Sequence, residues 1–118
     1  MRWRALLGGV AAVAYAAAAH AHAFLDHAQP AVGSAAVEPP ARVQLWFTQR
    51  IEPAFSTIQV LAVSGERVDR GESQVGGDRT QLMVALKPLA PGRYKVVWRV
   101  VSVDTHVSTG DFSFEVRR

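Results

Sequence analysis

The sequence predicts an all-β sandwich for the chain that follows residue 21. Three observations support this fold class. Several short segments are rich in β-branched and aromatic residues, turn-forming residues separate these segments, and no stretch after residue 21 shows a sustained helical period. Short strands spaced in this way are typical of sandwiches and barrels.

The predicted strands follow one another along the chain at 42–48, 55–63, 80–87, 93–103 and 111–117. The first alternates apolar Val43, Leu45 and Phe47 with residues that face the other way, and the second is rich in β-branched residues. Turn formers separate the segments at Glu38-Pro39-Pro40, Ser64-Gly65, Gly76-Gly77-Asp78 and Pro91-Gly92. We expect the aromatic residues to fill the core (Trp46, Phe47, Trp98, Phe112 and Phe114) and the acidic ones to be solvated loop charges (Glu52, Asp69 and Glu72).

The strand at 93–103 predicts which side chains share a face. Its odd-numbered positions include the charged residues Arg93, Lys95 and Arg99, so the even-numbered positions should face the core. The odd-numbered valines of this strand then require cover from a loop or another strand. The even-numbered set continues into Asp104 and His106, which should point the same way, about 7 Å apart along the chain, unless a bulge changes the alternation.

Residues 1–21 have the features of a secretory leader. A basic start precedes an apolar, alanine-rich run of 15 residues, Ala5 to Ala19, against the roughly 20 that a membrane-spanning helix needs. The motif Ala19-His20-Ala21 predicts cleavage after Ala21, which gives a soluble exported domain of residues 22–118 beginning with His22. Cleavage after Ala19 is the alternative and would make His22 the third residue.

Composition disfavours several classes of function. The exported domain would have 97 residues, of which 11 are basic and 10 acidic, with no basic block, so nucleic-acid binding is not expected. The chain has no cysteine, which excludes thiolate metal sites, and Met83 is the one methionine after residue 21. Phosphate-binding glycine loops and G-x-S-x-G motifs are absent from the sequence, so we expect no enzyme of those kinds.

The histidines suggest a metal site instead. An N-terminal His22 offers its amine and its imidazole, and Asp104 and His106 add one oxygen and a third nitrogen. Such donors suit copper(II) in a tetragonal arrangement, while zinc, the competing metal, requires a tetrahedral set. An Asp-x-His pair alone is equally consistent with a surface salt bridge, so the prediction depends on His22. We expect His27, beside Asp26, to be an exposed strand residue and not a ligand.

Longer stretches of the chain resemble a known family. The start HAFL at 22–25 with Gln29-Pro30, the segment LWFT at 45–48 and above all GRYKVVWRVVSVDTH at 92–106, followed by GDFSF at 110–114, resemble the CopC-type periplasmic copper-resistance proteins. The resemblance covers essentially the whole exported domain. It implies an Ig-like Greek-key β-sandwich of about seven short strands, which holds one copper(II) ion through the amine and ring of His22 and through Asp104 and His106.

The resemblance also implies cleavage after Ala21, a periplasmic location, a role in copper sequestration, transfer or resistance, and an inner-membrane partner of the CopD type. Two departures narrow this expectation. Gln49 stands where some members have an acidic residue, which argues against a fourth ligand residue, and residues 61–75 contain no methionine for copper(I). The chain is therefore expected to bind and deliver copper(II) without turnover.

Two other classes match parts of the sequence. One is a copper-dependent oxidative enzyme with an N-terminal histidine, although 97 residues leave little room for a substrate face. The other is an Ig-like structural module whose histidines are incidental.

Overall fold

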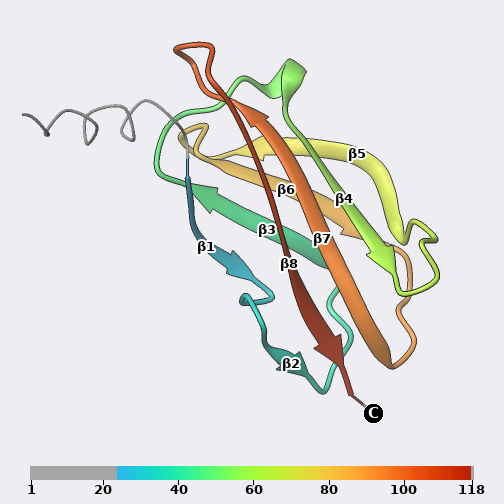
Figure 1. Ribbon diagram of the computed structural model, residues 1–118. Coiled ribbons are helices and arrows are strands. Elements are labelled where there is room, and N and C mark those ends of the chain that lie inside the picture. The colour runs from blue at the N-terminus through green and yellow to red at the C-terminus, as the bar shows by residue number, and fades with distance from the viewer. Residues whose placement is uncertain (1–23, 118) are drawn as a thin grey trace, which may run out of the picture.

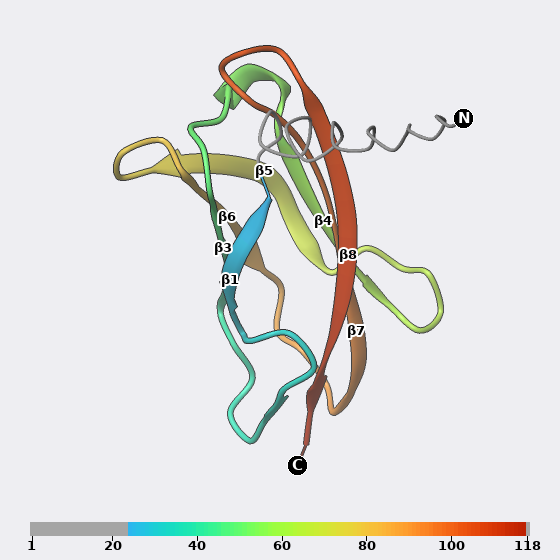
Figure 2. The ribbon, with the colours of Figure 1, turned by 60° about the vertical axis from the view of Figure 1, so that its left-hand side comes forward.

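The computed structural model describes residues 24–117, which form two four-stranded β-sheets packed face to face (Figures 1 and 2). One sheet has the strand order β1-β3-β6-β5 and the other β2-β8-β7-β4. The strands are β1 Leu25–Gln29, β2 Ala35–Ala36, β3 Arg42–Phe47, β4 Thr57–Ala62, β5 Asp69–Gly76, β6 Gln81–Leu86, β7 Gly92–Val101 and β8 Val107–Val116, and the short 3₁₀ helix η2 is Pro53–Phe55.

This strand order confirms the predicted Ig-like sandwich. An immunoglobulin constant-type fold has strands A, B, E and D in one sheet and C, F and G in the other. The order found here is the same if β1 is A, β3 is B, β4 is C, β5 is D, β6 is E, β7 is F and β8 is G. The additional strand β2 has two residues and pairs in parallel with β8.

The core lies between the two sheets and confirms the alternation predicted for two strands. Val43, Leu45 and Phe47 of β3 are buried, as are Tyr94, Val96 and Val100 of β7. The hydroxyl of Tyr94 donates to the carbonyl of Ala90 at 2.6 Å, the tyrosine corner typical of this fold class. The odd-numbered valines of β7 are only partly covered, since Val97 and Val101 are half-buried.

Two expectations about individual side chains were wrong. Trp46 does not join the core, because it alternates with the buried residues of β3 and stacks on the ring of His27 at 4.4 Å on the outer face of the sheet. Asp69 is not a solvated loop charge. It begins β5 and is 4 % exposed, and its carboxylate accepts hydrogen bonds from Arg67 and from the backbone of Val60.

The strand boundaries also differ from those predicted. Strand β5 was not expected, because an exposed edge strand shows little alternation, and its register with β6 is interrupted around Gly71, whose φ is +100°. Strand β7 ends at Val101, two residues before the predicted end, and β8 begins at Val107, four residues early. These last differences move Asp104 and His106 from a strand into a loop.

Candidate metal centre

Asp104 and His106 lie in the tight loop that joins β7 to β8. The amide of Ser102 donates to the carbonyl of His106 at 2.9 Å, and the amide of Thr105 donates to the carbonyl of Ser102 at 2.8 Å. These bonds define a hairpin with a three-residue loop. The expectation of two ligands spaced along one continuous strand was therefore wrong. The turn nevertheless brings the two side chains together, with His106 Nδ1 3.3 Å from Asp104 Oδ1.

The loop requires an unusual backbone conformation at Thr105. Its φ is +70°, in the left-handed region that three-residue hairpin loops use at their last position. Glycine usually occupies this position because a β-branched residue is strained there. The surrounding hydrogen bonds must therefore hold this conformation.

Ser102 bonds to both candidate ligands from the buried side of the loop. Its side chain is fully buried at 0 % exposed. The hydroxyl donates to Asp104 Oδ1, and the amide of His106 donates to Ser102 Oγ at 3.3 Å. Sequence reasoning did not identify this role, although the even-numbered alternation of β7 predicted that Ser102 faces the core, where a serine needs hydrogen-bond partners.

The Asp104 carboxylate is held in its charged form. The hydrogen bond from Ser102 lowers the pKa of Asp104, partial burial opposes this effect, and the His106 ring lowers the pKa further. The side chains of Asp104 and His106 are 48 % and 47 % exposed. The pair therefore presents an ionised carboxylate and an imidazole at the surface, where an ion has access to both.

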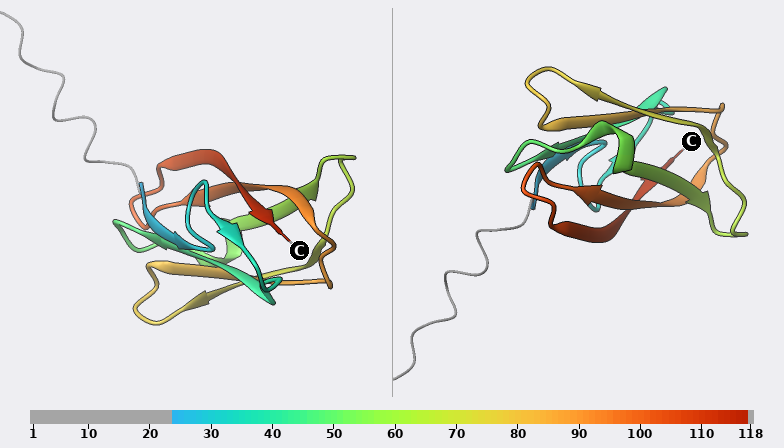
Figure 3. Two further views of the ribbon diagram at one scale, coloured as in Figure 1. Left: turned by 90° about the horizontal axis from the view of Figure 1, so that it is seen from below. Right: turned by 90° about the horizontal axis from the view of Figure 1, so that it is seen from above.

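The beginning of β1 lies at the same end of the sandwich as this loop (Figure 1), and the two lie on the same side when the sandwich is viewed end-on (Figure 3). The segment after β3 connects the two. Phe24 and Thr48 exchange two hydrogen bonds, of 3.0 Å from the Phe24 amide to Thr48 Oγ1 and 2.9 Å from the Thr48 amide to the Phe24 carbonyl. Two residues further on, the carbonyl of Arg50 accepts from the amide of Val103 at 3.1 Å. His22 itself lies outside the described residues.

The structure also locates His27 and Gln49, for which the sequence predicts no ligand role. His27 lies exposed on β1, as expected, where it stacks on Trp46 and its Nδ1 lies 2.7 Å from Asp26 Oδ2. Gln49 is half-buried in the segment between Thr48 and Arg50. Within residues 24–117, no three His, Cys, Asp or Glu side chains gather closely enough to hold a metal ion. Asp104 and His106 are thus two potential donors, and a metal ion at this loop would require more.

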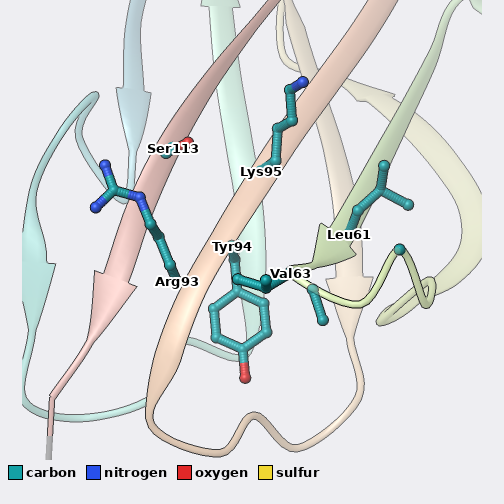
Figure 4. Close-up of a pocket in the computed structure, with 8 residues that line it drawn as sticks. Leu61, Val63, Arg93, Tyr94, Lys95 and Ser113 are labelled. Carbon is teal, nitrogen blue, oxygen red and sulfur yellow. The ribbon is translucent and has the colours of Figure 1, made fainter.

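A separate surface hollow lies at the opposite end of β7 (Figure 4). It is bordered by the end of β4 and the following turn on one side and by β7 and β8 on the other, and it is lined by Leu61, Ala62, Val63, Gly65, Arg93, Tyr94, Lys95 and Ser113. This lining contains no carboxylate or imidazole, and the Tyr94 hydroxyl is already bonded to Ala90. The hollow therefore lacks metal ligands, and the β7–β8 loop remains the candidate centre.

Within residues 24–117, no helical segment has the length and apolar character of a membrane span.

Comparison with known proteins agrees with the sequence resemblance. The family model described as CopC domain matches residues 25–117. Copper resistance protein C of Pseudomonas syringae pv. tomato is 34 % identical over 108 residues, covering 86 % of this chain and 85 % of that protein.

Two solved structures share the fold. The crystal structure of CopC from Methylosinus trichosporium OB3b is 33 % identical, with a TM-score of 0.76 over 81 % of this chain and 94 % of that one. PcoC, a methionine-rich copper resistance protein from Escherichia coli, is 30 % identical, with a TM-score of 0.72 over 81 % of this chain and 99 % of that one. The family match and these identities together show that this chain belongs to the CopC family.

Proposed function

We propose that this protein binds one copper(II) ion in the bacterial periplasm and holds it for sequestration or transfer, without catalytic turnover. The observation that carries the proposal is the pairing of Asp104 with His106 at 3.3 Å, at the end of the sandwich where β1 begins. The names of the relatives, which include copper resistance protein C, support copper as the metal.

The proposed ligands are the amine and imidazole of His22, the imidazole of His106 and the carboxylate of Asp104. Three nitrogens and one oxygen suit copper(II), which stands at the top of the affinity order for such donors. Phe24 is bonded to Thr48, and the two residues from His22 to Phe24 can span at most about 7 Å. This short tether supports a role for His22 in the same site as the β7–β8 loop.

The proposal requires that the chain be processed. Residues 1–21 would act as a secretory leader, and cleavage after Ala21 would expose the amine of His22. In an oxidising envelope a nitrogen and oxygen site retains copper(II). Reduction to copper(I), which prefers softer donors, would favour release. An inner-membrane copper protein of the CopD type is the proposed partner in transfer.

The test begins with mass spectrometry of the protein recovered from the periplasm, which should show His22 as the first residue. Copper(II) titration against a competing chelator should then give one tight site. Asp104→Ala with His106→Ala, or a single residue added before His22, should each reduce the affinity by at least about 100-fold, since each change removes direct ligands. Unchanged tight binding in both variants would refute the proposed site and favour a structural module with incidental histidines.

A further inference from the structure

We infer that Ser102 is a positioning residue for the metal site, which sets the geometry of Asp104 and His106 before the ion arrives. This inference rests on the proposed copper(II) function. It extends that function to a residue that would not touch the metal.

The Ser102 hydroxyl can bond to both candidate ligands at once. It has one hydrogen and can donate only once, and of the acceptors near it the Asp104 carboxylate is the stronger. The carbonyl of His106, at 3.3 Å, is the weaker alternative. With the hydrogen committed to Asp104, the oxygen lone pairs accept the amide of His106. One buried hydroxyl thus holds the side chain of one ligand and the backbone of the other.

The loop is also anchored to the sandwich on its buried side. Both ligand side chains are about half exposed, and Val103, Asp104 and Thr105 are all exposed loop residues. Ser102, in contrast, is fully buried, and its backbone pairs with Ile51 and with His106. The loop is therefore anchored to the rigid sheet from its buried side, through this serine. Side chains behind the ligands typically contribute 10–100-fold to metal affinity by orienting them.

The bond from Ser102 also determines which oxygen of Asp104 is occupied. Ser102 bonds to Asp104 Oδ1, which is also the oxygen that lies near the His106 ring. A carboxylate has about four acceptor positions on two oxygens. The serine therefore holds the carboxylate by one oxygen, and Oδ2 would be available to an ion.

The experiment compares variants of the exported protein that begin with His22. Ser102→Ala removes the hydroxyl. Ser102→Thr and Ser102→Val introduce side chains of nearly equal volume, but valine has a methyl group where threonine has the hydroxyl. Ser56→Ala is the matched control. Ser56 is also buried, at 3 % exposed, and its Oγ accepts from the amide of Val101 in the same hairpin at 3.1 Å, a bond that involves neither Asp104 nor His106.

Two readouts apply to each variant: copper(II) affinity against a competing chelator and the frozen-solution EPR spectrum. We expect Ser102→Ala and Ser102→Val to weaken copper(II) binding about 10-fold or more and to change the EPR parameters. Ser102→Thr should stay within about 3-fold of the natural chain, and Ser56→Ala should lose stability without a change in affinity or spectrum. Urea unfolding of each variant separates lost folding from lost positioning.

The outcomes distinguish this inference from the proposed function. If Ser102→Ala and Ser102→Val keep the natural affinity and spectrum while Asp104→Ala loses both, the positioning role is refuted and the copper site stands. Equal losses of affinity in Ser102→Val and Ser102→Thr would also refute the role, because the hydroxyl would then make no difference. If Asp104→Ala and His106→Ala change nothing, the proposed site itself fails.

Discussion

A single residue, Thr105, carries the backbone strain of the candidate metal loop. Its φ of +70° lies in the left-handed region, which costs a residue with a side chain about 1–2 kcal/mol. Asparagine and glycine are the residues that tolerate this region. The strain is located between the two candidate ligands, where a fixed loop shape is of use.

We predict that Thr105→Asn stabilises the protein. The free energy of unfolding should rise by about 0.5–1 kcal/mol, because asparagine removes the β-branched side chain from the left-handed conformation. Thr109→Asn is the matched control, since Thr109 is exposed in β8 opposite Arg99. In a strand the same substitution should be destabilising by up to about 1 kcal/mol. Urea unfolding measures the change in the free energy of unfolding for each variant. If both substitutions change it in the same direction, backbone strain at Thr105 is not the cause.

At the scale of elements, the edge strand β4 is protected by side chains of β5. The amide of Val60 donates to Asp69 Oδ2 at 2.8 Å, and the amide of Ile58 donates to Ser73 Oγ at 3.0 Å. An unpaired strand edge would otherwise offer these amides to other chains. Burial raises the pKa of Asp69, but the hydrogen bonds from Arg67, Val60 and Gly71 outweigh it, and the net pKa is lowered.

Asp69 therefore makes stability depend on pH. Its folded-state pKa lies below the ordinary value of about 3.9, so its contribution is fully present above that value. The contribution disappears as pH falls through the lower folded-state pKa. Asp69→Asn should reduce the free energy of unfolding at pH 7 by about 2 kcal/mol, since the Arg67 partner and one backbone amide lose their acceptor.

Urea unfolding across pH 7 to 2 tests this prediction. The difference between the natural chain and Asp69→Asn should shrink at the acidic end. Asp111→Asn, a change on the exposed face of β8, is the control and should have little effect at any pH. A difference that stays constant with pH would show that the charge of Asp69 is not responsible.

A second contact between elements joins β7 to β8 through Trp98 and Gly110, which are paired in register. The Trp98 ring packs against Phe47 and Phe112, with ring centroids 6.1 Å and 6.3 Å away. A Cβ atom at position 110 would lie 2.3 Å from Cζ2 of the indole. Gly110 is therefore required for the indole to lie over β8.

We predict that Gly110→Ala costs about 1–3 kcal/mol of stability, because the indole must move away from both phenylalanines. Tryptophan fluorescence should shift to the red as Trp98 becomes more exposed. In a Trp98→Leu background the same substitution should cost much less, and urea unfolding of the four proteins gives the coupling. Equal costs in the two backgrounds would mean that the indole is not the obstacle.

At the scale of the whole molecule, the proposed site joins distant parts of the chain. The β7–β8 loop is bonded to Arg50, and the segment around Arg50 is bonded through Thr48 to the beginning of β1. An ion held by His22, Asp104 and His106 would cross-link these parts in the folded state alone. Copper(II) binding should therefore be coupled to global stability.

We predict that copper(II) at 100 times its dissociation constant stabilises the exported protein by about 2.7 kcal/mol. This corresponds to a rise in melting temperature of about 10–20 °C for a domain of this size. The rise should diminish as pH is lowered, because protons compete with copper for the amine and the imidazoles. Thermal unfolding of the double variant Asp104→Ala, His106→Ala should show almost no rise, and an undiminished one would place the ion elsewhere.

The sequence by itself predicted the class of fold and the family, and it named Asp104 and His106 as candidate ligands without predicting the loop that holds them. Alternation along β3 and β7 was sufficient because each strand buries one face, and burial requires apolar side chains at every second position. The same rule failed for Trp46, which is aromatic but alternates outward, and for β5, whose exposed edge position requires no apolar pattern. The processing site and the role of His22 remain predictions.

Only the tertiary structure decided how the candidate ligands meet. A strand would have kept Asp104 and His106 about 7 Å apart, but the hairpin turn at Thr105 brings them together. No local sequence pattern predicts that a threonine adopts the left-handed region. Folding likewise decided the roles of Ser102, Gly110 and Asp69. The side chains of Ser102 and Asp69 bond to groups that only the folded chain places beside them, and Gly110 leaves room for the indole of Trp98.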